Sequence, residues 1–122
     1  MPVRIKQKLR LAGTVTPSGL NAETNVVSLD VQSNDYIVEG FISLRNMSSG
    51  DSLVVREYVI IDGTNYDITD EITFSTAPNV KAVRVPAMTI SYNGQFKVTI
   101  TQTAGTVRSY PYVFIVQILE EI

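Results

Sequence analysis

Residues 3–11 constrain the fold more than any other part of the chain, because polar and apolar residues alternate along them. Successive side chains of an extended strand point to opposite faces, so a period of two predicts a β-strand with one apolar face and one basic face. A helix would spread both sets around its circumference. The apolar set is Val3, Ile5, Leu9 and Leu11, and the basic set is Arg4, Lys6, Lys8 and Arg10. The basic face predicts either contact with an anionic partner or an edge strand that charge protects from unwanted pairing.

The rest of the sequence continues in β-favouring segments, about eight to ten short strands separated by turn signals, with no convincing helix. Asp62-Gly63 predicts one hairpin turn. Asn93-Gly94 predicts another, of type I′, between the alternating residues 88–92 and 96–100. This spacing in a small chain is typical of an all-β, antiparallel β-sandwich. We expect an Ig-like or related Greek-key order, with a jelly roll or a β-barrel as the alternative.

The length of 122 residues suits one domain that spans 1–122, and no linker or repeat divides it. Within that domain, residues 1–12 are expected to form an arm or an edge strand. No targeting signal is visible, because no apolar run of signal-peptide length follows the charged start. The longest apolar stretch, residues 112–119, is too short to cross a bilayer as a helix. We therefore expect a soluble chain made without a removable leader.

The composition excludes several kinds of chemistry. The chain has no cysteine and no histidine, which removes thiolate catalysis, Ser-His-Asp triads and ordinary zinc sites. A net charge of −2 gives no overall attraction to nucleic acid or membrane. No aromatic residue lies among the N-terminal cations to stack on bases. We expect no enzyme activity, no catalytic residue, no cofactor and no metal.

Two groups of residues have a functional and a structural interpretation. The acidic group could bind calcium through several oxygens, but its spacing is not that of an EF-hand, and solvated turn residues are the favoured interpretation. Its members are Asp62, Asp67, Asp70 and Glu71. The tyrosines could form a carbohydrate-stacking platform, or they could cap the core where strands begin and end. They are Tyr36, Tyr58, Tyr66, Tyr92, Tyr110 and Tyr112.

The C-terminal segment is apolar on both strand faces from residue 112 to residue 119. A strand of this kind needs cover on both sides, from its own core or from another subunit. One hypothesis is that its even-numbered residues join a neighbouring chain, and the alternative is a central core strand. The candidate interface residues are Tyr112, Phe114, Val116 and Ile118, together with the four cations of the basic face. Glu120 and Glu121 form an acidic tail that could lie beside the basic strand of the same or another copy.

The segment from Met88 to Gln102 is rich in Thr, Val and Ser and centres on a turn. Together with the basic, arm-like start and the lack of catalytic residue types, it resembles the small structural proteins of tailed-virus particles, such as head decoration or cement proteins. The resemblance implies a virion structural protein that forms symmetric homo-oligomers on a capsid-like assembly, with protein partners rather than nucleic acid or membrane. The alternative is a carbohydrate-binding or adhesion module, extracellular or at a cell surface.

Overall fold

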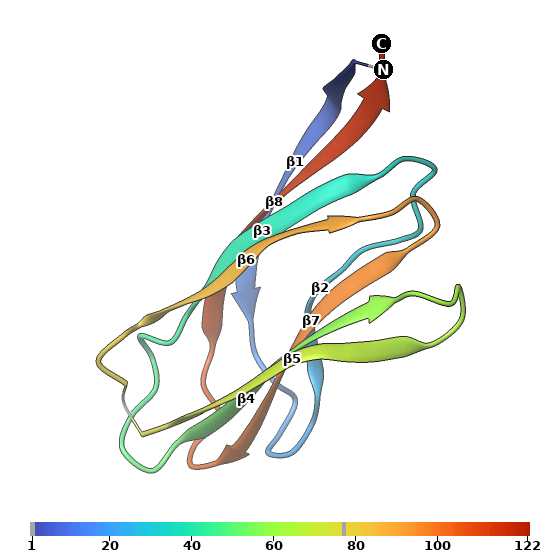
Figure 1. The fold of residues 1–122 in the computed structure, drawn as a ribbon. Coiled ribbons are helices and arrows are strands. Elements are labelled where there is room, and N and C mark those ends of the chain that lie inside the picture. The colour runs from blue at the N-terminus through green and yellow to red at the C-terminus, as the bar shows by residue number, and fades with distance from the viewer. Residues whose placement is uncertain (1, 77) are drawn as a thin grey trace.

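The computed structural model describes residues 2–76 and 78–122, which form two four-stranded antiparallel sheets (Figure 1). The described residues contain no helix. The first sheet has the order β1 (Val3–Val15), β8 (Tyr110–Glu121), β3 (Tyr36–Ser43) and β6 (Ala82–Ile90). The second has the order β2 (Thr24–Ser28), β7 (Gln95–Ala104), β4 (Ser52–Ile60) and β5 (Tyr66–Ser75). The predicted all-β sandwich is confirmed.

The connections define a jelly roll, which was the alternative expectation. Every pair of consecutive strands except β4 and β5 crosses from one sheet to the other. Eight strands connected in this way form two Greek keys. The expected Greek-key connections are therefore present. The Ig-like order is not, because an Ig sandwich places its first and last strands in different sheets. Here β1 and β8 pair with each other.

The two predicted turns have different outcomes. Asp62-Gly63 joins a true hairpin, since Ile60 pairs with Tyr66 across it. The chain also reverses at Asn93-Gly94, where the Gly94 amide donates to the Ser91 carbonyl over 2.9 Å. However, β6 and β7 lie in different sheets and do not pair. Asn93 has a positive φ of 65° but Gly94 does not, so the turn is not of type I′. The local sequence specified the reversal, while the partners of both strands were set by packing.

The core lies between the two sheets and is built from alternate residues of their central strands. Its fully buried members include Tyr36, Val38 and Ile42 of β3, Phe96, Val98 and Ile100 of β7, and Tyr110 and Phe114 of β8. Gly40 of β3 lies where β8 comes closest. A Cβ at Gly40 would lie 2.4 Å from both the Val113 carbonyl oxygen and the Phe114 ring. Only glycine permits this approach.

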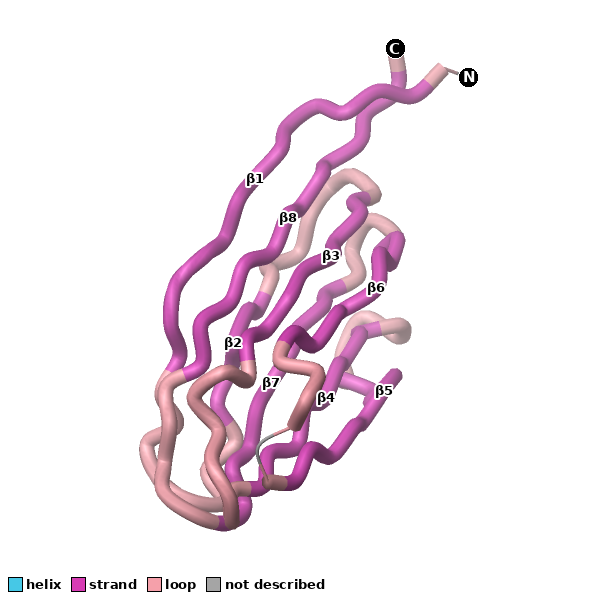
Figure 2. The backbone as a smooth tube through the Cα atoms, turned by 90° about the vertical axis from the view of Figure 1, so that its left-hand side faces the viewer, coloured by secondary structure: helices cyan, strands magenta, loops and turns pink. Residues whose placement is uncertain are grey.

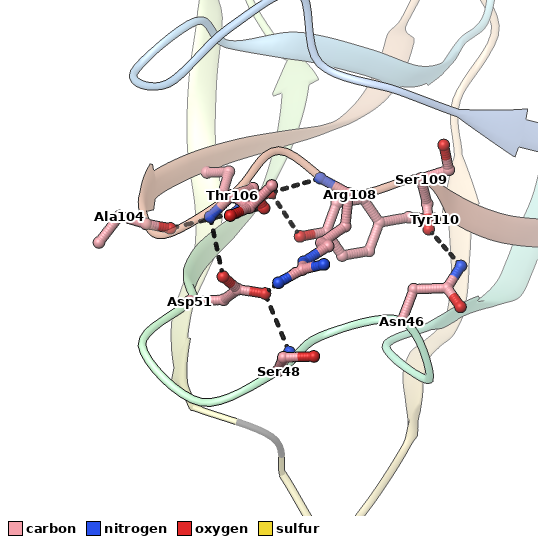
Figure 3. A network of polar contacts seen from close by, with 9 residues as sticks. Asn46, Ser48, Asp51, Ala104, Thr106, Arg108, Ser109 and Tyr110 are labelled. Atoms are coloured by element: carbon pink, nitrogen blue, oxygen red, sulfur yellow. Dashed lines mark hydrogen bonds and ion pairs between the residues drawn. The ribbon is translucent and has the colours of Figure 1, made fainter.

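A buried carboxylate lies in a network of polar contacts (Figure 3) at the end of the sandwich away from the N and C labels of Figure 1. Asp51, which is 1% exposed, accepts hydrogen bonds from the Ser48 and Thr106 amides over 2.9 and 3.1 Å. Its Oδ2 also lies 2.8 Å from Arg108 Nε. Beside it, the buried Gln102 side chain accepts from the Tyr110 hydroxyl and donates to the Thr106 carbonyl. These contacts fasten the β3–β4 and β7–β8 connections to each other.

At the other end, β1 and β8 run on as a two-stranded ribbon past the neighbouring loops (Figures 1 and 2). Pro2 and Ile122 lie together at its tip, where the Ile122 amide donates to the Pro2 carbonyl over 3.0 Å. Val3 and Ile5 in this ribbon are 57% and 50% exposed, whereas Leu9 and Leu11 further along β1 pack against the core. Val3 and Ile5 precede a β-bulge at Lys6 and Leu9 and Leu11 follow it, so the predicted single apolar face of the first strand is divided between the two sides of the sheet.

Replacing Gly40 by alanine should destabilise the protein by about 2–3 kcal/mol, because the added Cβ forces β3 and β8 apart. Gly19→Ala is the matched control, since a Cβ there would meet nothing within 4 Å. Urea unfolding followed by circular dichroism measures both variants. Equal stabilities would show that the close approach at Gly40 is not a constraint.

Asp51→Asn should cost about 2–3 kcal/mol at neutral pH, because a side-chain amide cannot accept from all three donors. Burial alone would raise the pKa of Asp51, but the hydrogen bonds from Ser48, Arg108 and Thr106 outweigh burial and lower it below 3.8. The folded state therefore favours the carboxylate, and its contribution is lost as the pH falls from 3.8 through the lowered pKa. Denaturation at several pH values should show that the difference in free energy of unfolding between wild type and Asp51→Asn becomes smaller at low pH. The exposed Asp30→Asn should show no such difference.

Candidate assembly surfaces

A β-bulge divides the predicted basic face of β1 into two. Arg4 pairs with Glu120 of β8 before the bulge, and Lys8 and Arg10 pair with Gln117 and Ile115 after it. Directly opposed residues of an antiparallel pair share a face, and β8 alternates regularly. Arg4 therefore lies on the face opposite that of Lys8 and Arg10. The extra residue between Ile5 and Gln7 reverses the parity, and sequence alternation alone does not reveal it.

Lys6 lies at this bulge and has no β8 partner in the register. Arg4 is occupied by a contact within the chain, since its Nε lies 2.8 Å from Glu120 Oε1. The acidic tail thus lies beside the basic strand of its own copy at this point, as one of the two predictions had it. Both side chains are partly exposed, so the pair contributes little to stability. The cations of β1 without an ion pair in the described part of the chain are Lys6, Lys8 and Arg10.

The even-numbered residues of β8 point into the sandwich. Phe114, Val116 and Ile118 are 0%, 2% and 7% exposed, and Tyr112 is half-buried against the same core. Phe114, Val116 and Ile118 are thus core residues of an inner strand. Their position does not match the hypothesis that they form an interface. The second apolar set of β8 lies on the other side, and it includes Val113 and Ile115.

The odd-numbered residues of β8 lie on the outer face of the first sheet, where no other element of the described chain covers them. Phe41 of β3 pairs with Val113, and Ile37 of the same strand lies on the same face. The Phe41 side chain is 49% exposed. Two shallow hollows of about 270 and 200 Å³ flank it, and Val113 lines both. We call Ile37, Phe41, Val113 and Ile115 the outer apolar face, and these residues share that side of the sheet with Glu39 of β3 and with Lys8 and Arg10 of β1.

The alternation of residues in β3 does not by itself assign the Phe41 side chain to the outer surface. A signal was available, because Val38, Gly40 and Ile42 have the opposite parity in β3. Those three face the core together with Tyr36. The alternation alone could not say which of two apolar sets would be the buried one.

The outer face of the second sheet is polar and its groups pair with one another. The Glu23 carboxylate accepts hydrogen bonds from Thr99 and from the Tyr58 hydroxyl, and these two bonds, with Arg56 and Lys97 nearby, lower its pKa despite some burial. Arg56 Nε lies 2.7 Å from Glu71 Oε2. The charges of Glu23, Arg56 and Glu71 are thus paired on this face, while Ile68, opposite Tyr58 at the β5 edge of the face, is 54% exposed.

The six tyrosines do not gather into one platform. Tyr36 and Tyr110 are fully buried in the core. Tyr58 and Tyr66 lie together on the second sheet, where the Lys97 ammonium sits 4.8 and 4.2 Å from their ring centres. A sugar ring would have to displace this cation to stack there.

The acidic residues of 62–71 do not converge either. Asp62 accepts hydrogen bonds from the Asn65 and Thr64 amides and the Asn65 side chain, which lower its pKa to about 2. It stabilises its own turn, as the favoured interpretation had it. Among the described residues, no group of three or more His, Cys, Asp or Glu is placed to hold a metal ion.

No helix in residues 2–76 and 78–122 is long and apolar enough to span a membrane. The sequence matches no known protein-family model and no curated protein. Its fold is similar to that of two solved structures. One comes from Bacillus endospore appendages, which are described as disulfide-linked pili, with 12% identity over 92% of this chain and 87% of the other and a TM-score of 0.55. The other is the VP2 subviral particle of infectious bursal disease virus, with 12% identity over 92% of this chain but 32% of the other and a TM-score of 0.50. Identities this low show a shared fold alone.

Glu57 of β4 is a buried carboxyl, 6% exposed, opposite Asp70 of β5. Burial, and secondly the charge of Asp70, raise the pKa of Glu57 above 4.5. The folded state therefore favours the protonated form, and wild type loses stability as the pH rises from 4.5 through the raised pKa.

Glu57→Gln should consequently stabilise the protein at neutral pH, with a gain that shrinks as the pH falls toward 4.5. Thermal unfolding across this pH range measures the gain. The exposed Glu39→Gln serves as the control and should change stability by less than about 0.5 kcal/mol at every pH. A gain that did not depend on pH would show that the buried charge of Glu57 is not what destabilises wild type.

Proposed function

We propose that this protein is a non-enzymatic structural subunit that associates with copies of itself in a virion, as a decoration or cement protein does. The observation that carries this proposal is the outer apolar face. It lies on the first sheet, on strands whose other side already forms the core. Antiparallel sheets commonly leave one polar face in water, so apolar side chains exposed on the outer face of this sheet are a departure that a partner surface would cover. Exposed apolar patches on small proteins commonly mark contacts with other macromolecules.

The two similar structures are consistent with such a role. Both belong to assemblies by their descriptions, a pilus and a subviral particle. The present chain has no cysteine, so its own assembly would be non-covalent, unlike the disulfide-linked pili. A particle surface is the proposed location, with an extracellular or cell-surface site as the alternative. The absence of histidine and cysteine from the sequence agrees with a role without catalysis.

A carbohydrate-binding module has less support as a second candidate. It requires exposed aromatic rings on one face. The Tyr58–Tyr66 pair is the nearest approach to such a face, and Lys97 covers it. Tyr92, at 61% exposure, lies apart from this pair on the β6–β7 turn.

Phe41→Asp tests the proposal, because it places a charge in the centre of the outer apolar face at a half-exposed position. We expect the wild type to form oligomers as its concentration rises, and the variant to need at least about tenfold more protein for the same mass. Light scattering and sedimentation velocity over a concentration series measure this. Val31→Asp, at a position 52% exposed in the β2–β3 connection, is the matched control and should associate like wild type. A wild type that stays monomeric at all concentrations would overturn the proposal.

A further inference from the structure

We infer that copies of this chain join head to tail, with β1 of one copy pairing edge to edge with β5 of the next. This inference rests on the proposed self-association and specifies how it occurs. Addition of a strand to an open sheet edge is an established mode of protein association. The backbone groups at such an edge have no partner within the sheet.

The two sheets offer four edges, and two of them are poor templates. β2 has only five residues. β6 contains Pro86, which lacks an amide hydrogen, and its pairing with β3 is irregular around Glu39. Short strands, proline, bulges and charged side chains are the usual features that stop an edge from pairing, and charge does so where the facing strand carries the same sign. The two remaining edges, β1 and β5, have 13 and 10 residues and no proline. Each carries one irregularity, at Lys6 in β1 and at Thr69 in β5.

β5 is unusually open for a strand of a sandwich. All its residues except Tyr66 and Phe74 are exposed. They include Ile68 and Ile72, at 54% and 43% exposure. Its hydrogen-bonded partner is β4 alone. A long, exposed and partly apolar edge strand is a ready template for another chain.

The charges on the two edges are opposite. β5 carries Asp67, Asp70 and Glu71 and no cation. Glu71 is paired with Arg56, which leaves two carboxylates without an ion pair among the described residues. β1 carries its three unpaired cations and no anion. Opposite charges on facing strands favour pairing, and like charges oppose it. Pairing of β1 with β1 or of β5 with β5 is therefore disfavoured, and pairing of β1 with β5 is favoured.

The positions of the two edges make this contact directional. β1 contacts β2 of the second sheet, whereas β5 lies at the end of that sheet farthest from β2. The two edges thus lie on opposite sides of the sandwich (Figure 2). A single copy cannot pair them with each other. A contact between different patches of two copies is heterologous, and its repetition gives a ring or an open chain.

The test uses two variants with reversed charges. Lys8→Glu with Arg10→Glu leaves Lys6 as the unpaired cation of β1 beside two new carboxylates, so that both edges have an excess of negative charge. Asp67→Lys with Asp70→Lys gives both edges an excess of positive charge. Each variant alone should associate about tenfold more weakly than wild type, because like charges face each other at every contact. An equimolar mixture should recover wild-type association, because each edge of one variant then meets an opposite edge of the other. Sedimentation velocity of the separate and mixed proteins measures this.

Two control variants and a salt series distinguish charge pairing at the edges from a general effect of net charge. Lys8→Gln with Arg10→Gln is a milder variant, which should weaken association less than charge reversal does. Arg45→Glu with Lys81→Glu has the same net charge as Lys8→Glu with Arg10→Glu but lies off both edges, and should associate like wild type at equal concentration. Raising the salt from about 0.1 to 1 M, which shortens the screening length from about 10 to 3 Å, should weaken wild-type association.

The outcomes separate this inference from the proposed function. If wild type associates but neither charge reversal nor the mixture has an effect, the edge pairing is wrong and self-association stands. If only the variant with an altered β1 loses association, and the mixture does not recover it, then β1 has another partner surface and the inference is also overturned. If wild type never associates, both fail.

Discussion

The pairing of the first and last strands organises this molecule. β8 lies between β1 and β3, so it fixes the order of the whole first sheet and brings the chain ends together. It also directs Phe114 and Val116 into the core, and the absence of a side chain at Gly40 lets β3 approach it closely. Since a strand has two faces, the same placement turns Val113 and Ile115 outward. The outer apolar face therefore follows from the inner position of β8 in the first sheet and from its two apolar sets of residues.

The two ends of the sandwich are stabilised in different ways. At the end near Asp51, a buried carboxylate and a buried glutamine satisfy the amides of two connections, which holds those connections in one arrangement. At the ribbon end, β1 and β8 extend past the rest of the sandwich and pair with each other, and apolar side chains there are exposed. Two-stranded ribbons are marginally stable by themselves. The ribbon end is therefore the part of the first sheet with most to gain from contact with another molecule.

The outer apolar face and the two charged edges have different physical roles, although Arg10 of the β1 edge lies beside Ile115 of the outer apolar face. Burial of apolar area supplies affinity without direction. Charged edges add little affinity when they are exposed, but they discriminate between correct and incorrect pairings. A subunit that carries both can associate strongly and in one orientation.

The sequence alone determined that the chain is a β-sandwich. A period of two and frequent turn residues are local properties, and they do not depend on which strands pair. It also located the Asp62-Gly63 hairpin and the chain reversal at Asn93-Gly94. Only the tertiary structure decided which strands pair, and so the jelly roll replaced the Ig-like order. It also decided which of the two apolar sets of β8 is buried, and a single bulge near Lys6 moved Arg4 away from Lys8 and Arg10. Register and pairing depend on contacts between residues far apart in the chain, and local alternation carries no information about those contacts.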